Sequence, residues 1–266
     1  MAFHPRRALA VFWKDSLDLR KNKGLLWTMA VLPAMLVLIP AGIVYGYAHD
    51  PGDPSLRTMA LFYDSSIQTN ASAARFLIDK TLTDWFGLYL IMPIFVPIFI
   101  SSQSVAGEKE RRTLEPLLAS PVTAAEILAG KSLASLVPAV ALSVVAFLVL
   151  CILVDLVAWP YTHELLLPNG MWLFGVLVIA PLFAFFGNGV AVLVSARVAE
   201  ARMAQQLSGL VTLPLIGLVG GQLAGLLKAG TFYYAIEGGV VLLLDVVLVV
   251  AAVRLFDRER LISRWV

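Results

Sequence analysis

Long stretches without charged residues divide the chain into membrane-spanning and connecting segments. Five of them reach the roughly 20 residues that a helix needs to cross the hydrocarbon core of a bilayer. They cover residues 25–48, 85–107, 132–154, 165–196 and 203–227. A sixth stretch, 238–253, contains a single charged residue, Asp245. Strands of a membrane barrel would be about half as long and would alternate in polarity. The pattern predicts six transmembrane helices, at 25–47, 85–107, 127–154, 171–195, 204–227 and 236–254.

Residues 6–22, which precede the first span, have the pattern of an amphipathic helix. Apolar and charged side chains separate onto two faces when this segment is wound at 3.6 residues per turn. The apolar face holds Leu9, Phe12, Trp13 and Leu17, and Arg7, Lys14, Asp18 and Lys21 lie towards the other. Such a helix lies in the membrane interface with its apolar face towards the acyl chains. The alternative is a basic cytoplasmic tail, which would leave Phe12 and Trp13 in water.

The longest connection, residues 48–84, joins the first two predicted spans on the outer side. We expect a short strand at residues 59–63 and a surface helix at 71–82. The connection is too short to hold a catalytic domain. The simplest interpretation is an all-α membrane protein with one transmembrane domain over residues 1–266.

Composition and charge agree with this fold class. The chain is 59% hydrophobic and only 14% charged, whereas soluble domains carry about 25% charged residues. With both termini inside, 16 of the 20 lysines and arginines fall on inner segments. The positive-inside rule therefore places both termini in the cytoplasm, and we expect a multi-pass protein of the plasma membrane. The net charge of +2 comes mostly from these basic anchors, so a nucleic-acid partner is not expected.

Two partial motifs fail as catalytic or metal sites. Residues 130–132 read Gly-Lys-Ser, the end of a phosphate-binding P-loop, but Ala125 stands where that motif needs its first glycine. Lys131 is interpreted as an anchor at the membrane interface. His163 and Glu164 begin a zinc-binding pattern, but Leu167 occupies the place of the second histidine. We therefore expect no catalytic residue, no metal site and no ATP hydrolysis by this chain alone.

Polar and small residues inside the spans give two further candidates. Asp245 is the one acid well inside a predicted span, and such residues are functional candidates because they are costly to bury. It would serve an ion-coupled carrier, or it is a protonated or hydrogen-bonded acid in the bundle interior. Gly217, Gly221 and Gly225 follow at spacing four and would let two helices approach closely. That approach would occur within one copy or between two copies of the chain.

The segment 108–122 combines a dense charge cluster with apolar residues between long charge-free runs. It reads Glu-Lys-Glu-Arg-Arg-Thr-Leu-Glu-Pro-Leu-Leu-Ala-Ser-Pro-Val, and Glu-Ile-Leu-Ala-Gly-Lys follows at 126–131. This sequence resembles the loop between spans two and three of the ABC type-2 export permeases. A second similarity comprises Ser195 and Arg197, then Ala-Gln-Gln at 204–206 and Leu-Pro-Leu at 213–215. Many members of that family have glycine where Arg112 stands.

The resemblance implies a short cytoplasmic coupling helix that docks in a groove on a separate ATP-binding subunit. The expected coupling residues are Glu108, Glu110, Arg111, Arg112, Thr113, Leu114, Glu115, Leu117 and Leu118. Leucines at helical spacing would anchor such a helix, and the charges would set its register.

By the same resemblance, two copies of the chain, or the chain and a close relative, form the substrate pathway from spans one, two and five. Two ABC ATPase subunits would bind below, with ATP and Mg²⁺ in those partners and no cofactor in this chain. The apolar lining predicts a hydrophobic, amphipathic or lipid-like substrate that is exported. The alternatives are an ion-coupled secondary carrier and a non-transporting membrane scaffold or immunity protein.

Overall fold

The computed structural model describes residues 4–110, 122–224, 226–227 and 230–262, and every regular element among them is helical. The elements are α1 (Pro5–Lys21), α2 (Lys23–His49), α3 (Pro54–Leu61), α4 (Asn70–Glu110), α6 (Ala124–Thr162), α7 (Gly170–Phe174), the π-helical η1 (Gly175–Ile179), α8 (Ala180–Arg197), α9 (Ala201–Leu223) and α10 (Thr231–Ile262). Six helical stretches are long and apolar enough to cross a membrane. The predicted all-α membrane protein with six spanning helices is therefore confirmed.

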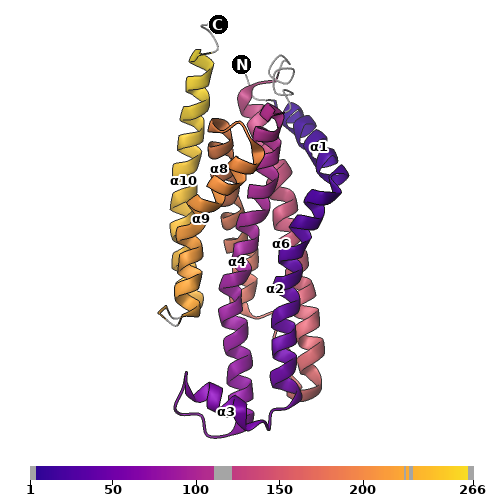
Figure 1. Cartoon of the computed structure of the whole chain (residues 1–266), viewed down its shortest axis with the longest axis vertical. Helices are drawn as coiled ribbons and strands as arrows, with labels where there is room; N and C mark the ends of the chain where they lie inside the picture. Colours follow the sequence, from indigo (N-terminus) through magenta and orange to yellow (C-terminus); the bar gives the residue numbers. More distant parts are fainter. Residues whose placement is uncertain (1–3, 111–121, 225, 228–229, 263–266) are drawn as a thin grey trace.

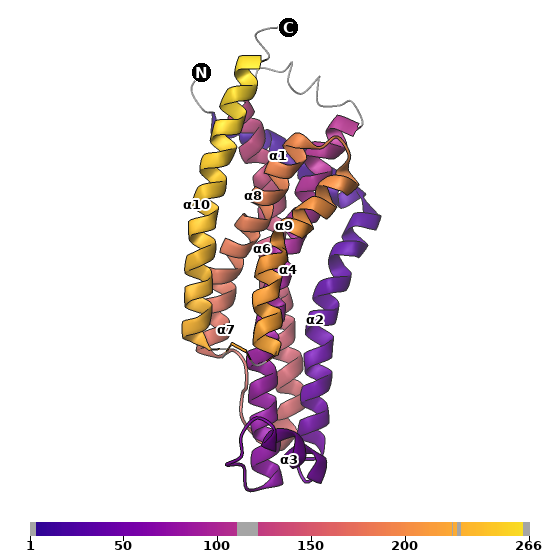
Figure 2. The same cartoon turned by 60° about the vertical axis from the view of Figure 1, so that its left-hand side comes forward.

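The spanning helices form one elongated bundle around α4 (Figure 1). Helix α4 packs against α2, α6, α8 and α9, whereas α10 packs mainly on α8 at the edge of the bundle. In the most apolar stretch of α4, 72% of the residues are buried, against 22% in α10. Figure 1 shows α9 and α2 on either side of α4, and in the turned view of Figure 2 α9 lies in front of α4. We call the two ends of the bundle the α1 end and the α3 end.

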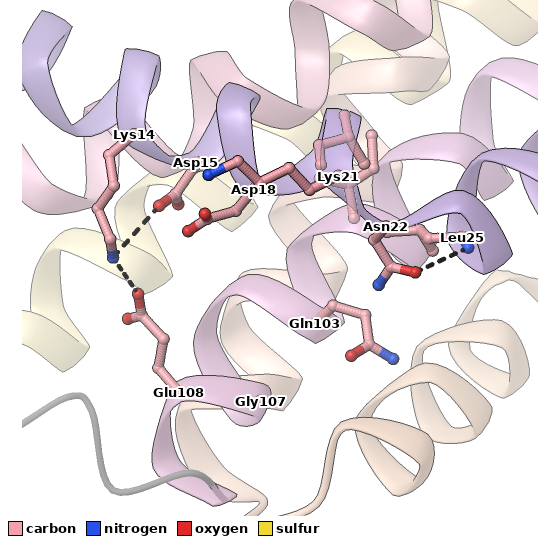
Figure 3. A pocket seen from close by; sticks show the side chains of 11 residues that line it. Lys14, Asp15, Asp18, Lys21, Asn22, Leu25, Gln103, Gly107 and Glu108 are labelled. Atoms are coloured by element: carbon pink, nitrogen blue, oxygen red, sulfur yellow. Dashed lines mark hydrogen bonds and ion pairs between the residues drawn. The ribbon is translucent and has the colours of Figure 1, made fainter.

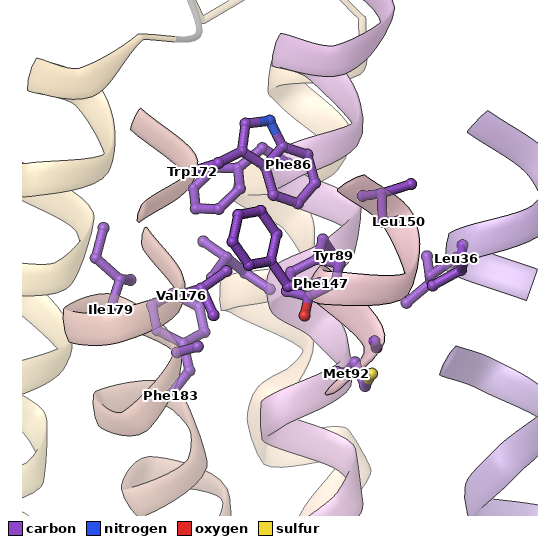
Figure 4. Packing of buried hydrophobic residues seen from close by; sticks show 14 of the residues in the cluster. Leu36, Phe86, Tyr89, Met92, Phe147, Leu150, Trp172, Val176, Ile179 and Phe183 are labelled. Carbon is purple, nitrogen blue, oxygen red and sulfur yellow. The ribbon is translucent and has the colours of Figure 1, made fainter. Parts of the chain in front are cut away.

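Aromatic side chains from several helices hold the middle of the bundle together. Trp172 stacks on Phe147 with ring centroids 5.7 Å apart, and Phe86 meets Trp172 edge-on at 4.9 Å. The Tyr89 hydroxyl donates a hydrogen bond to the backbone carbonyl of Ser143. These residues come from α4, α6 and α7 and are almost fully buried (Figure 4). Aromatic pairs add roughly 0.5–1.5 kcal/mol each beyond the area that they bury, so this cluster fixes how the central helices pack.

The backbones of α4 and α8 touch at Gly187. A Cβ atom added there would lie 2.2 Å from the Ile94 carbonyl oxygen. Because backbone cannot move aside as a flexible side chain can, Gly187→Ala should lower the free energy of unfolding by about 1–3 kcal/mol. Gly42→Ala in α2 is the matched control, since a Cβ there meets nothing within 4 Å. Thermal unfolding in detergent should show a large downward shift for the first variant alone; equal midpoints would contradict this packing.

The connection between α2 and α4 differs from the prediction. The strand expected at residues 59–63 is wrong, because residues 54–61 form α3. Asp53 caps this helix by accepting a hydrogen bond from the Ser55 amide at 2.8 Å, and Pro54 occupies its first turn. The separate helix expected at 71–82 is also corrected, because these residues belong to the 41-residue helix α4. At 1.5 Å per residue α4 is about 60 Å long, so it extends beyond a bilayer core of about 30 Å.

Candidate functional site

Helix α1 lies directly against the first turns of α6. Its buried residues are Ala8 and Val11. A Cβ atom at Gly130 of α6 would come within 2.5 Å of the Ala8 carbonyl oxygen. Gly130 therefore serves close helix contact, which explains the glycine in the incomplete P-loop pattern. The apolar side chains of Leu9, Trp13 and Leu17 remain exposed on α1, and their location in the membrane interface stays a prediction.

Four charged side chains join α1, α4 and α6 at this end of the bundle. The Lys131 ammonium lies 3.1 Å from the Asp15 carboxylate and 2.9 Å from the Glu108 carboxylate. Lys14 approaches the same two carboxylates at 3.7 and 2.9 Å. Figure 3 shows Lys14 reaching from α1 to Glu108 at the end of α4. We call Lys14, Asp15, Glu108 and Lys131 the charge cluster.

The side chains of the charge cluster differ in their exposure to solvent, from the buried Lys131 to the half-exposed Lys14. The Lys131 side chain is only 4% exposed, while those of Asp15 and Glu108 are 10% and 13% exposed. Lys14 is 49% exposed. Burial lowers the pKa of Lys14, but the hydrogen bond and charge of Glu108, with Asp15 and Asp18, outweigh it, so its net pKa is raised. Lys131 was predicted to be an interfacial anchor. The structure corrects this, because its charge is buried between two carboxylates.

Glu126 makes a second connection between α1 and α6. Its carboxylate accepts a hydrogen bond from the Thr123 amide at 2.8 Å and thereby closes a capping box at the start of α6. The same carboxylate accepts a hydrogen bond from the His4 amide at 2.7 Å and lies 4.0 Å from the Arg7 guanidinium. The first turn of α1 is thus fixed to the first turn of α6.

The predicted coupling segment starts at this site. Of the expected coupling residues, Glu108 and Glu110 are described, whereas Arg111, Arg112, Thr113, Leu114, Glu115, Leu117 and Leu118 lie outside the described residues. Glu108 belongs to the charge cluster, and Glu110 accepts a hydrogen bond from the Ala201 amide at the start of α9, at 3.4 Å. The chain therefore enters segment 111–121 from a helix end that contacts α1, α6 and α9.

A buried polar contact lies further into the bundle and was not identified from the sequence. Asn188 of α8 accepts hydrogen bonds from the hydroxyls of Ser101 and Ser135, at 2.8 and 2.7 Å. Ser135 stands one helical turn beyond Lys131 in α6. Small polar residues in apolar helices at matching depth are the signal that could have found this contact. It links α4, α6 and α8 next to the charge cluster.

The glycines of α9 are only partly placed. A Cβ atom at Gly217 would meet nothing within 4 Å, and at Gly221 it would meet only the Leu227 side chain at 3.4 Å. Gly225 lies outside the described residues. Within the described part of the chain, no other helix packs closely against these two glycines. Contact between this face of α9 and a second copy of the chain stays a prediction.

Asp245 is buried within the bundle, and α10 buries a second acid, Glu237. Asp245 and Glu237 are each 4% exposed on α10, and within the described residues none of their carboxylate oxygens has a hydrogen-bond partner. Their helix packs on α8 and η1, with Gly189 facing Leu248 and Gly238 facing Ile179. Sequence reasoning missed Glu237, although its spacing of eight from Asp245 puts both acids on one helical face.

The comparisons with known proteins identify the kind of protein to which this site belongs. A family model described as ABC-2 family transporter protein matches residues 9–238. The match runs from α1 into α10 and includes the charge cluster, segment 111–121 and Glu237. No curated protein and no solved structure matches the chain.

Proposed function

The chain belongs to the ABC-2 family of transporter proteins, and from this premise we propose that it is a permease subunit driven by separate ABC ATPase subunits. Two copies, or this chain and a close relative, form the substrate pathway, and one ATPase subunit binds below each. ATP and Mg²⁺ belong to those ATPase subunits. The α1 end is then the cytoplasmic end, and the protein lies in the plasma membrane with both termini inside.

The charge cluster is the observation that carries this proposal. Glu108 stands three residues before segment 111–121, and Lys131 follows that segment by ten residues in the next helix, yet their charges are 2.9 Å apart. An ATPase that pushed on this segment would therefore move the ends of α4 and α6 together. Asp15 would pass the displacement to α1, and the hydrogen bond from Ala201 to Glu110 would pass it to α9.

The proposed cargo is hydrophobic, amphipathic or lipid-like, and its direction is outward. The pathway would be lined by α2, α4 and α9. The exposed side chains of α2 and α9 are mostly apolar, whereas α4 is largely buried between its neighbours. A preformed charged cavity within the span would argue for a polar cargo instead. Transport that follows a small inorganic ion would contradict this part of the proposal.

An ion-coupled carrier is the second candidate, and one specific observation favours it. Carriers place ionisable residues inside the membrane, and α10 buries Glu237 and Asp245 without hydrogen-bond partners among the described residues. Such a carrier would need no ATPase partner. The two candidates therefore differ in what purifies with the chain.

Purification of the tagged chain from its native host in mild detergent should recover a stoichiometric soluble subunit with a Walker A motif, identified by mass spectrometry. Replacing Leu114 and Leu117 together by aspartate should abolish that recovery, because a coupling helix that docks through these leucines would lose its apolar anchors. The matched control replaces Leu61 and Leu165, which are exposed outside the bundle core, and should keep the ATPase. A wild-type chain that repeatedly purifies alone would favour the carrier.

A further inference from the structure

A cavity of about 540 Å³ opens beside the charge cluster, where α1 meets α2 and α4 ends (Figure 3). Its size falls within the range of about 300–1,000 Å³ that is usual for small-molecule sites. The lining residues are Lys14, Asp15, Asp18, Leu19, Lys21, Asn22, Leu25, Ile100, Gln103, Gly107 and Glu108. The cavity thus has charged, amide and apolar walls in one place.

Two charges of opposite sign remain available to a ligand. Lys14, Asp15 and Glu108 are engaged in the charge cluster. Asp18 and Lys21, in contrast, form no ion pair within 4.0 Å among the residues that the structure describes, although the charge of Asp18 contributes to the raised pKa of Lys14. They are one turn apart on α1, and both line the cavity. A ligand that satisfies both must carry a cation and an anion a few bonds apart.

Amide and apolar groups complete the walls. The Asn22 side-chain oxygen accepts a hydrogen bond from the Leu25 amide at 3.1 Å, and Figure 3 shows its amide nitrogen on the side of Gln103. Amide N–H groups of this kind donate to phosphate oxygens. Leu19, Leu25 and Ile100 supply the apolar wall, and the latter two belong to the helices that enter the membrane.

The position of the cavity suits the headgroup layer of a bilayer. It lies at the junction between α1 and the first turn of the spanning helix α2. Trp27, exposed on α2 just past that junction, is of the residue type enriched at membrane–water interfaces. An amphiphile bound here would have its head among the charges and its chain towards Leu25 and Ile100.

We propose that this cavity binds the headgroup of an aminophospholipid from the leaflet next to α1. Its ammonium group lies against the Asp18 carboxylate, and its phosphate lies against Lys21 and the Gln103 amide. One acyl chain follows Leu25 and Ile100 into the membrane. A purely anionic headgroup fits less well, because three carboxylates and two lysines line the cavity. This lipid site shares the helices α2 and α4 with the proposed cargo pathway, but lipid binding there does not require the proposed ATPase subunits.

The test uses the full chain in phosphatidylcholine nanodiscs that contain either phosphatidylethanolamine or phosphatidylglycerol, with bound lipid measured by native mass spectrometry. Phosphatidylethanolamine should be retained over phosphatidylglycerol. Asp18→Asn and Lys21→Gln should each lower its affinity about tenfold, as expected for loss of one charge-assisted hydrogen bond. Arg20→Gln is the matched control, because this exposed α1 residue is not part of the lining, and it should leave the affinity unchanged.

Three results would overturn the lipid site. Equal retention of phosphatidylglycerol would show that the site does not recognise the ammonium group of phosphatidylethanolamine. An equal loss in the Arg20→Gln variant would show that only the overall charge of α1 matters. Soluble phosphoethanolamine that competes as well as the lipid would assign the cavity to a soluble ligand. Thermal unfolding of each variant checks that α1 remains folded against α6.

Discussion

Replacing Lys131 with methionine should lower the free energy of unfolding by about 3–5 kcal/mol, the usual effect of removing one partner from a buried ion pair. Lys131 is only 4% exposed and lies between the carboxylates of Asp15 and Glu108. Without it, the half-exposed Lys14 is the lysine that remains beside these two acids, and like charges from α1 and α4 face each other. Thermal and denaturant unfolding in detergent would measure the loss.

Lys14→Met is the control for this prediction, because it removes an equal charge from the same two acids. Lys14 is 49% exposed, so its removal should cost no more than about 1 kcal/mol. Adding Glu108→Gln to Lys131→Met should restore part of the lost stability, since it removes one of the acids that Lys131 neutralised. Equal losses for the two lysine variants would mean that burial does not set the strength of the charge cluster.

The spanning helices could be predicted because each depends on a local property, a run of apolar residues. Their full lengths could not. Residues 70–84 carry charges and lie outside the apolar run, yet they continue α4 because α3 packs against them through Leu56, Ala60 and Leu77. The strand prediction at 59–63 followed the aromatic and apolar content and ignored the stronger start signal of Asp53 and Pro54.

The candidate site could be predicted only in part, for a reason of distance. Glu108 and Glu110 stand out in the sequence because they are charges beside a long apolar run. Their partners within the chain cannot be read from spacing, since Lys14 is separated from Glu108 by 94 positions and Ala201 from Glu110 by 91. Burial of Lys131 depends on how α1 folds back onto α6, which is a tertiary property. The packing of the π-helical turn η1 is also a tertiary property. The ring of Phe86 from α4 occupies the space where a side chain at Gly175 would lie.

Asp245→Asn should leave folding and ATP-dependent transport nearly unchanged, whereas Asp245→Arg should prevent a stable bundle. A carboxyl group without a hydrogen-bond partner costs less to bury when it is protonated, and asparagine is a neutral group of the same size. An arginine has no such neutral form. Its insertion at mid-span costs about 2.5–3.5 kcal/mol on insertion scales, and neither α8 nor η1 contains an acid to pair with it.

Expression level, gel-filtration profile and transport in proteoliposomes would separate these outcomes, with Glu237→Gln as the matched neutral change on the same face of α10. Both neutral variants should behave like the parent chain, because neither removes a hydrogen bond that the described residues make. A complete loss of transport in a well-folded Asp245→Asn variant would show instead that the proton on this acid is exchanged during transport. That result would make α10 part of an ion-coupled mechanism, since a purely structural acid can be replaced by its amide.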